Sequence, residues 1–227
     1  MIFTFWEGTM PDYLKLCMKT WKLPYTVLTY DTLHNYTNLE VTDNLKKFSL
    51  PQQADVVRVH VLRDNGGYWL DADTIMLSDD LPTETILGNN ERRTNTIGYL
   101  HTNARSFMFI SWAEYQQRVL KTLPDFGWDV MGNRFADKYL KERQDIVIGD
   151  ITPHWAETYL TYGVGSRYSK YKQVYFVDKY QLSDLRPTNL IMLHNSWTPS
   201  WYKQLSEKEV LEQDCTLSNI LRGLLNG

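Results

Sequence analysis

The sequence predicts an α/β fold in which a mixed, mostly parallel sheet is flanked by helices. Short β-favouring runs alternate with segments whose apolar residues recur at helical spacing. Strands joined through helices lie parallel in one sheet, and ligands of such folds bind beyond the carboxyl ends of the strands. A chain of 227 residues is long enough to bury one core well. We therefore expect a single domain over residues 1–227.

The first third of the chain predicts strand, helix, strand and helix. Residues 2–6 are a β-favouring run, and residues 13–21 carry apolar side chains at helical spacing. Pro24 ends that helix, and residues 25–30 form a second strand, before a polar stretch that runs to Lys47. Residues 55–63 mix apolar and charged side chains in a pattern that fits a helix better than strict alternation does.

The rest of the chain predicts further strands and helices around an acidic triplet, Asp71-Ala72-Asp73. The predicted strands are residues 68–70, 74–77, 97–100, 174–177 and 190–193. The predicted helices are residues 109–120, 130–140 and 205–225, the last with an apolar stripe. Residues 144–165 combine Pro153, Trp155 and glycines, which is typical of a lid or an acceptor-facing region.

Composition excludes several classes of protein. A net charge of −3, from 24 basic and 27 acidic residues, provides no broad positive field for nucleic acid. Cys17 and Cys215 lack metal-ligand spacing and fit a reducing cytosol, with one long-range disulfide as the alternative. The sequence has neither an apolar run long enough to span a bilayer nor the layout of a signal peptide. We therefore expect a soluble or peripheral protein without a nucleic-acid partner.

The acidic triplet predicts a metal site. Asp71 and Asp73 are separated by one residue at the end of a short strand, and carboxylate oxygens suit Mg²⁺ or Mn²⁺. Gly66 and Gly67 allow a sharp turn before the strand, because glycine adopts positive φ without steric cost. A solvated turn is the alternative, but the apolar flanks favour the metal site. The 15 tyrosines and 8 tryptophans suit stacking on sugars and bases, although most such rings fill cores.

Three motifs together resemble a known family. They are FWEG at residues 5–8, ADVVR followed by GGYWLDAD at residues 54–73, and HNSWTPSW at residues 194–201. The chain resembles the DXD-containing glycosyltransferases of capsular polysaccharide synthesis and the fungal initiating α-mannosyltransferases, and distantly the large clostridial glucosylating toxins. The resemblance implies a GT-A (Rossmann-like) fold and a retaining transferase that uses a UDP-sugar with Mn²⁺ or Mg²⁺. It also implies a nucleotide-sugar-binding half over residues 1–100, an acceptor-facing half over 101–204 and a terminal helix over 205–227.

The resemblance also implies roles for individual residues. Asp73 and His194 correspond to metal ligands, and Asp71 to a residue that touches the ribose or sugar and the metal's outer shell. Asp71, Asp73 and Arg58 are the expected catalytic residues. The expected donor-binding set also includes Trp6 on uracil, Asp55 and Arg58 on the sugar hydroxyls and diphosphate, and Gly67, Ser200 and Trp201.

Two positions depart from the family pattern. Trp69 stands where the family more often has Tyr, and Asn195 replaces the second histidine of the C-terminal motif. His194, Asn195 and Ser196 are therefore all candidates for the C-terminal metal ligand. We expect front-face transfer assisted by the leaving phosphate, with Asp150 and Glu157 as the candidate nucleophiles of a two-carboxylate alternative.

Each expected role has a structural alternative. Asp55 and Arg58 lie three positions apart on a predicted helix, so an ordinary surface ion pair competes with a site role. His194 follows an apolar run, where a satisfied core histidine is the default, and Trp6 is also typical of a core. The basic and aromatic segment 167–172 and the helical tail are candidates for membrane contact, against a solvated loop and a packed helix.

The sequence thus predicts a bacterial, cytoplasmic glycosyltransferase, with peripheral contact at the inner membrane face as an option. It would move a hexose from a UDP-sugar to a glycan or lipid-linked oligosaccharide acceptor in the synthesis of capsular polysaccharide, exopolysaccharide or another surface glycan. Two alternatives come from other classes: a metal-dependent nucleotide-sugar hydrolase and a non-catalytic sugar-binding domain.

Overall fold

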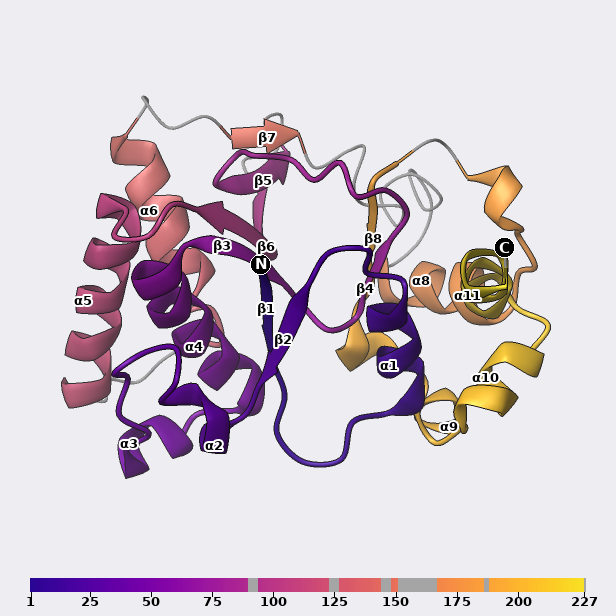
Figure 1. Cartoon of the computed structure of the whole chain (residues 1–227), viewed down its shortest axis with the longest axis horizontal. Helices are drawn as coiled ribbons and strands as arrows, with labels where there is room; N and C mark the ends of the chain where they lie inside the picture. The colour runs from indigo at the N-terminus through magenta and orange to yellow at the C-terminus, as the bar shows by residue number, and fades with distance from the viewer. Residues whose placement is uncertain (90–93, 123–126, 144–147, 151–166, 186–187, 227) are drawn as a thin grey trace. The chain divides into compact units, whose positions relative to one another are not determined.

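A computed structural model describes residues 1–89, 94–122, 127–143, 148–150, 167–185 and 188–226 (Figure 1). The contacts within the chain divide it into two compact units, which we describe separately. Unit 1 comprises Met1–Glu7, Pro24–Asp71 and Pro82–Ile151. Unit 2 comprises Gly8–Leu23, Ala72–Leu81 and Thr152–Gly227. The expectation of one domain over the whole chain stays a prediction.

Unit 1 is built on a sheet that has six strands within its described residues, in the order β2-β1-β3-β6-β5-β7. The strands are β1 Ile2–Phe5, β2 Tyr25–Leu28, β3 Gly67–Leu70, β5 Ile86–Asn89, β6 Thr94–Thr102 and β7 Ile148–Asp150. β1 is parallel to β2 and β3, and β5 is parallel to β7. β6 is antiparallel to β3 and β5. The predicted mixed, mostly parallel sheet is confirmed, although β5 and β7 were not predicted.

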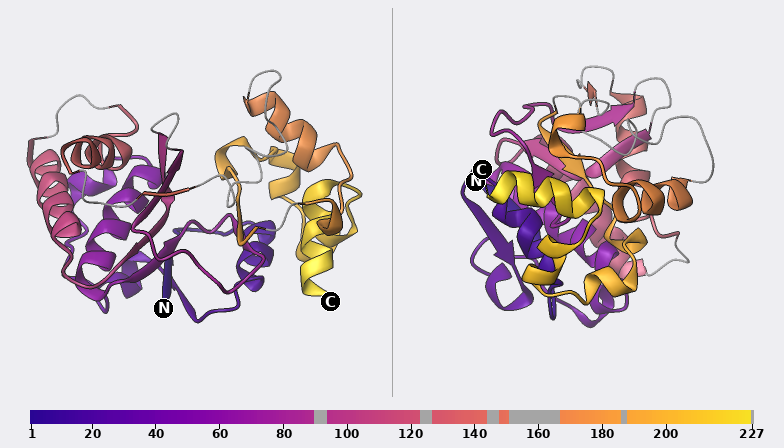
Figure 2. Two further views of the ribbon diagram at one scale, coloured as in Figure 1. Left: turned by 90° about the horizontal axis from the view of Figure 1, so that it is seen from above. Right: turned by 90° about the vertical axis from the view of Figure 1, so that its right-hand side faces the viewer.

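Helices cover the sheet of unit 1. They are α2 Tyr30–Leu33, α3 Asp43–Lys46, α4 Leu50–Asn65, α5 Phe107–Thr122 and α6 Asn133–Glu142. α4 contacts β1, β3, β6 and α5, while α6 packs on β6 and α5, so α4, α5 and α6 lie together beside the sheet (Figures 1 and 2). The three longer helices were predicted. No helix was predicted for α2 and α3, which precede Lys47 and lie largely in the polar stretch after the second strand.

The sequence of α4 explains both of its ends. Pro51 stands in the first turn, and Oε1 of Gln52 accepts a 3.1 Å hydrogen bond from the Ser49 backbone N–H. Gly66 ends the helix with φ of 67°, and Gly67 follows with φ of 89°. An added Cβ would lie 2.5 Å from the Ala104 nitrogen at Gly66 and 2.7 Å from the Met1 oxygen at Gly67. The predicted sharp turn into β3 is therefore confirmed, and it requires glycine at both positions.

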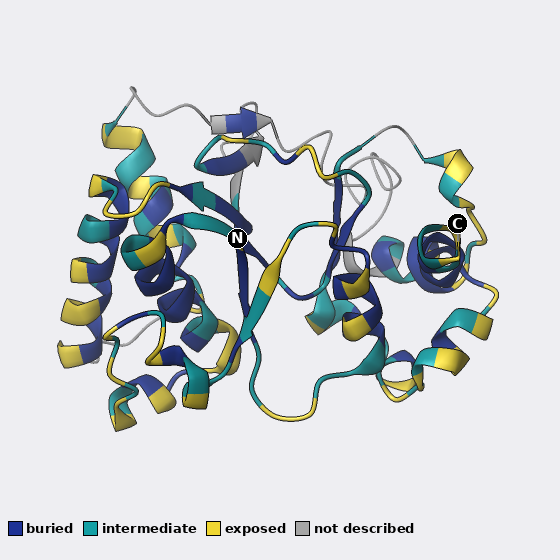
Figure 3. Ribbon diagram, in the orientation of Figure 1, coloured by how far each residue is buried: buried dark blue, intermediate teal, exposed yellow. Residues whose placement is uncertain are grey.

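The core of unit 1 lies between the sheet and these helices. Figure 3 shows β1 and the inner sides of α4 and α5 as buried. The large buried side chains include Phe3, Trp69, Phe109 and Trp112. Burying one side chain of this size contributes about 1.5–3 kcal/mol, so this cluster fixes α4 and β3 relative to each other.

Unit 2 contains a two-stranded antiparallel sheet, β4 Thr74–Met76 with β8 Leu190–Met192. Its helices are α1 Asp12–Lys19, α8 Arg167–Phe176, η2 Leu182–Asp184, η3 Asn195–Trp197, α9 Ser200–Lys203, α10 Glu207–Glu212 and α11 Thr216–Leu225. The predicted helix after β1 and both predicted strands are confirmed. Among the described residues, no helix is long and apolar enough to cross a bilayer.

Two expectations for unit 2 need correction. Residues 174–177 were predicted as a strand, but Val174, Tyr175 and Phe176 lie in α8. Tyr171, Val174 and Tyr175 are buried at helical spacing, and this packing overrides the β propensity of the run. The tail from residue 205 is two helices rather than one, because α10 starts at a Ser206 cap and ends before Gln213. Residues 144–147 and 151–165 of the expected lid lie outside the described residues, and this range includes Glu157.

Candidate active site

A buried ion pair occupies the middle of α4 in unit 1. Asp55 and Arg58 are 7% and 4% exposed, and the Arg58 Nη2 lies 3.0 Å from the Asp55 Oδ1. The alternative of an ordinary surface pair is therefore wrong. Removing one partner of a buried pair leaves an uncompensated charge, which typically costs about 3–5 kcal/mol. The pair therefore belongs to the interior of unit 1 rather than to a solvated helix face.

The Arg58 guanidinium is held on several sides by unit 1. Its Nη2 is 3.2 Å from the Asp71 Oδ1, its Nη1 donates to the Ile97 carbonyl, and its Nε donates to the Ala54 carbonyl at 3.4 Å. The carbon at the centre of the guanidinium is 5.1 Å from the ring centroid of Trp69, within cation–π range. These contacts hold a permanent positive charge next to Asp71.

Asp71 connects this buried cluster to the surface. Its backbone N–H donates to the Gly98 carbonyl at 2.9 Å, which anchors the residue to β6. Its Oδ1 accepts a 2.9 Å hydrogen bond from the indole Nε1 of Trp69, in addition to the contact with Arg58. The side chain is nevertheless 40% exposed. Asp71 is thus an oriented carboxylate that a ligand can reach.

The electrostatic environment of Asp55 is unusual. Burial raises the pKa of Asp55 to about 7, against the lowering effect of Arg58 and with a further increase from the Asp71 carboxylate. Both protonation states of Asp55 are therefore accessible near neutral pH. Carboxylates with a strongly shifted pKa and a specific charge partner are concentrated at functional sites.

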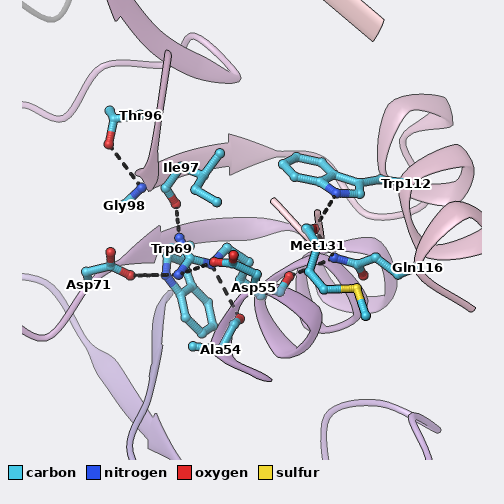
Figure 4. Close-up of polar contacts among 11 residues, drawn as sticks. Ala54, Asp55, Trp69, Asp71, Thr96, Ile97, Gly98, Trp112, Gln116 and Met131 are labelled. Carbon is cyan, nitrogen blue, oxygen red and sulfur yellow. Dashed lines mark hydrogen bonds and ion pairs between the residues drawn. The ribbon is translucent and has the colours of Figure 1, made fainter. Parts of the chain in front are cut away.

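Two residues outside the predicted set, Gln116 and Gly132, contact Asp55 in α4. The Gln116 Nε2 donates to the backbone oxygens of Asp55 at 2.9 Å and Met131 at 2.7 Å, and the Trp112 Nε1 donates to the same Met131 oxygen at 3.0 Å (Figure 4). Gly132 lies directly on Asp55, since an added Cβ would be 2.7 Å from its Oδ2. The residues that contact Asp55 in this way are 61 or more positions away from it in the sequence, so no local sequence pattern indicates these contacts.

Asp73, the other acid of the triplet, belongs to unit 2. Its Oδ2 accepts a 2.6 Å hydrogen bond from the Asn195 backbone N–H, and its carbonyl accepts a 3.2 Å bond from the Leu193 N–H. The Asn195 Oδ1 in turn accepts a 2.6 Å hydrogen bond from the Tyr13 hydroxyl. Burial raises the pKa of Tyr13, so its hydroxyl stays protonated and donates.

Aromatic side chains surround the C-terminal motif. The His194 ring centroid lies 4.1 Å from that of Trp197, and the His194 backbone N–H donates to the Tyr171 hydroxyl at 3.1 Å. His194 is half-buried, so it is not the fully enclosed core histidine that the apolar run before it favours. Ser200 begins α9, and Trp201 is 47% exposed. The assignment of His194, Ser200 and Trp201 to metal and phosphate stays a prediction.

Trp6 and Gly67 complete the predicted set and lie in unit 1. Trp6 follows β1 and is half-buried, and its buried indole N–H has no hydrogen-bond partner among the described residues. Gly67 opens β3, where its backbone packs on the Met1 oxygen. Asp150 is the last residue of β7, and the structure does not describe its side chain. The expected contact between Trp6 and uracil also stays a prediction.

The donor set around Asp73 suits a hard divalent cation. Within the described ranges, no group of three or more His, Cys, Asp or Glu side chains gathers closely enough to enclose a metal. Mg²⁺ in nucleotide sites is usually held by only one or two carboxylates, with waters and substrate phosphates as the other ligands. Asp73 supplies one such carboxylate, and the Asn195 backbone N–H is hydrogen-bonded to it. His194 directly precedes Asn195 in the sequence. The residues present therefore fit that mode of binding.

Comparison with known proteins gives a match to a protein family and a likeness to a solved glycosyltransferase structure. The model of the family described as "Capsular polysaccharide synthesis protein" matches residues 1–145, which include Asp55, Arg58, Asp71 and Asp73. The structure of the PaToxG glycosyltransferase is similar with a TM-score of 0.46 and 12% identity, over 62% of this chain and 67% of that chain. A search of curated protein sequences finds no match.

Proposed function

This chain belongs to the capsular polysaccharide synthesis protein family, and we propose that it is a glycosyltransferase that moves a hexose from a UDP-sugar to a glycan acceptor. The observation that carries the proposal is the arrangement of Asp71, a half-exposed carboxylate of a D-x-D motif that a buried arginine and an indole N–H orient. A carboxylate presented in this way suits recognition of sugar or ribose hydroxyls, because it only accepts hydrogen bonds.

Sugar transfer places specific demands on such a site. The bond between the anomeric carbon and the diphosphate breaks, so negative charge builds on the leaving phosphate oxygen while the sugar ring becomes positive. Asp71 fixes the donor through hydroxyl groups, and Arg58 holds Asp71 from behind. The expected direct contact of Arg58 with the diphosphate remains part of the proposal. The ion pair of Arg58 with Asp71, and its hydrogen bonds to the Ala54 and Ile97 carbonyls, also support a role in orienting Asp71.

The proposed metal ligand is Asp73, with His194 and Asn195 as its candidate partners. Mn²⁺ or Mg²⁺ bound there would supply positive charge for the diphosphate of the donor. The Asn195 N–H keeps the Asp73 carboxylate in one orientation. Trp201, which is largely exposed, and Ser200 are proposed to close over the phosphate and exclude water, which separates transfer from hydrolysis.

The remaining features of the proposal follow from the resemblance. We propose retention of the anomeric configuration through front-face attack, assisted by the leaving phosphate. The proposed acceptor is a growing surface glycan or a lipid-linked oligosaccharide. The proposed location is the cytoplasm, with peripheral contact at the inner face of the membrane.

The proposal is tested by offering the protein a panel of UDP-sugars with Mn²⁺ or with EDTA. We expect UDP release from one donor, dependent on the metal and accelerated by a glycan acceptor. Free sugar released at a rate that no acceptor changes would indicate a hydrolase instead. Donor binding without any UDP release would indicate a sugar-binding domain.

A further inference from the structure

Trp69 makes a polar contact that its place in the core does not require. It lies in β3 and is 1% exposed, among the large apolar side chains of unit 1. A buried indole N–H needs a hydrogen-bond partner, and backbone carbonyls are the common choice, as for Trp112 with Met131. The Trp69 Nε1 instead donates to a carboxylate, Asp71 Oδ1, at 2.9 Å. Hydrogen bonds to ionised groups are among the stronger ones in proteins.

The same oxygen of Asp71 also forms an ion pair. The Arg58 Nη2 lies 3.2 Å from Asp71 Oδ1, and the Arg58 Cζ lies 5.1 Å from the ring centroid of Trp69. The indole therefore contacts Asp71 through its N–H and Arg58 through the face of its ring. Trp69 lies in β3, and Asp71 directly follows the last residue of that strand, two positions further on.

The indole hydrogen bond and the ion pair with Arg58 make the two carboxylate oxygens of Asp71 distinguishable. Oδ1 faces Trp69 and Arg58, whereas Oδ2 receives no hydrogen bond from any residue in the described part of the chain. The side chain is 40% exposed, so solvent or a ligand reaches it. A hydrogen bond and an ion pair on one oxygen restrict rotation of the carboxylate, and a ligand that binds to Oδ2 then meets an acceptor that is already oriented.

We propose that Trp69 is a positioning residue that orients Asp71 for the sugar-nucleotide donor. The proposal rests on the proposed function, since it assigns Trp69 to the same site. Trp69 acts through Asp71 and does not itself touch the donor. Its ring fills the core and packs on Arg58, while its N–H sets the direction of the acceptor oxygen. Phenylalanine at this position keeps a ring beside Arg58 but removes the donor to Asp71.

The contact itself is tested without any substrate. The indole N–H signal of Trp69 in a ¹H–¹⁵N spectrum is identified by its loss in Trp69→Phe. We expect this signal to move upfield in Asp71→Ala, because the proton loses a charged acceptor. The indole signal of Trp112, identified in the same way by Trp112→Phe, serves as the control and stays in place. An unmoved Trp69 signal would overturn the proposal.

The role in donor binding is tested by a double-mutant cycle. The probe is the UDP-sugar from which the wild-type protein releases UDP, and its dissociation constant is measured for wild type, Trp69→Phe, Asp71→Ala and the double variant. We expect Trp69→Phe to weaken binding about tenfold in the wild-type background, the effect of one hydrogen bond to a charged group. In the Asp71→Ala background we expect the same change to have less than about a twofold effect, since alanine has no acceptor for the indole N–H.

The outcomes separate a positioning role from a packing role. Trp112→Phe removes the same volume from the same core. It also removes an indole N–H, but the Met131 oxygen that accepts from it keeps its hydrogen bond from Gln116. Trp112→Phe therefore controls for lost packing. Equal weakening by Trp69→Phe in both backgrounds, or equal weakening by Trp112→Phe, would show packing alone and overturn the proposal. Wild-type protein that releases UDP from no donor would overturn the proposed function and this role of Trp69 with it. A functional wild type with unaffected Trp69→Phe would overturn the role alone.

Discussion

The backbone N–H of Asn195 donates a 2.6 Å hydrogen bond to Oδ2 of Asp73, which lies 122 positions earlier in the chain. The antiparallel pairing of β4 with β8 brings the two segments together, since Thr74 pairs with Met192. The 3-10 turn η3 then directs the Asn195 N–H toward the carboxylate. The second acid of the D-x-D motif and the C-terminal motif are thus one structural element of unit 2.

The hydroxyl of Tyr13 supports this element, and its removal is expected to weaken metal binding. Tyr13→Phe deletes the donor to Asn195 Oδ1, so the amide next to Asp73 is no longer held. We expect the Mn²⁺ concentration for half-maximal UDP release to rise about three- to tenfold, as for loss of one ordinary hydrogen bond of about 1 kcal/mol. Tyr202→Phe is the matched control, because that buried hydroxyl contacts Ser218 instead. Equal metal dependence in all three proteins would contradict the role of Tyr13.

The buried pair of Arg58 and Asp55 is expected to dominate the stability of unit 1. Arg58→Met leaves Asp55 buried without its cation, and we expect the free energy of unfolding in urea to fall by about 3 kcal/mol or more at pH 8. The loss is expected to be smaller at pH 6, where Asp55 can be neutral, since its pKa is already raised to about 7 by burial. Arg134→Met is the control, because its 2.9 Å pair with Asp129 is half-exposed and worth at most about 1 kcal/mol. Similar losses in both variants would argue against a special role for Arg58.

His60 is expected to make the protein sensitive to mild acid. Burial lowers the pKa of His60 to about 4, and within the described residues neither ring nitrogen has a hydrogen-bond partner. The unfolded chain binds a proton near the ordinary pKa of about 6.5, whereas the folded chain resists protonation, so stability is full above this value and falls as pH drops toward 4. The free energy of unfolding of His60→Leu, measured from pH 4.5 to 8, should fall less on acidification than that of wild type. Parallel curves would show that His60 does not cause the loss.

The contact between Gly132 and Asp55 is expected to tolerate no side chain. In Gly132→Ala the added Cβ would lie 2.7 Å from Asp55 Oδ2 and 2.3 Å from Ile97 Cδ1. We expect a loss of about 1–3 kcal/mol in the free energy of unfolding and a fall in the rate of UDP release, because α4 or β6 must shift. Gly223→Ala in α11 is the control, since its nearest neighbour is 3.4 Å away and alanine favours a helix by about 1 kcal/mol. A Gly132→Ala protein as stable and active as wild type would contradict the contact.

Much of the fold of unit 1 could be predicted from local pattern. The β-favouring runs at β1 and β2, the mixed pattern of α4 and the two glycines before β3 each agree with their structure, because propensity and packing favour the same state there. In unit 2 the prediction of a strand at residues 174–177 failed, because this β-favouring run belongs largely to α8. Tyr171, Val174 and Tyr175 are buried at helical spacing, and tertiary packing outweighs a propensity of about 1 kcal/mol or less.

The candidate site could be predicted as residues but not as an arrangement. Asp55 and Arg58 were expected as neighbours on a helix, but their burial comes from Ile97 and Gly132, which are distant in sequence. The Trp69 N–H bond to Asp71 was open to prediction, because residues two apart on a strand share a face. Which residue of the C-terminal motif meets Asp73 depends on the pairing of β4 with β8, and no local pattern carries that information.

The most direct test of the proposed function is the rate of Mn²⁺-dependent UDP release by wild type, Asp73→Asn and Asp79→Asn. Asp79 is an exposed acid six positions further along the chain, so its variant controls for the loss of one negative charge. We expect UDP release by wild type and by Asp79→Asn. We expect Asp73→Asn to release UDP at least about a hundredfold more slowly, with an unchanged melting temperature, because losing one transition-state contact slows a reaction by about this factor. Wild-type rates in Asp73→Asn would contradict the assignment of the D-x-D motif to the chemistry.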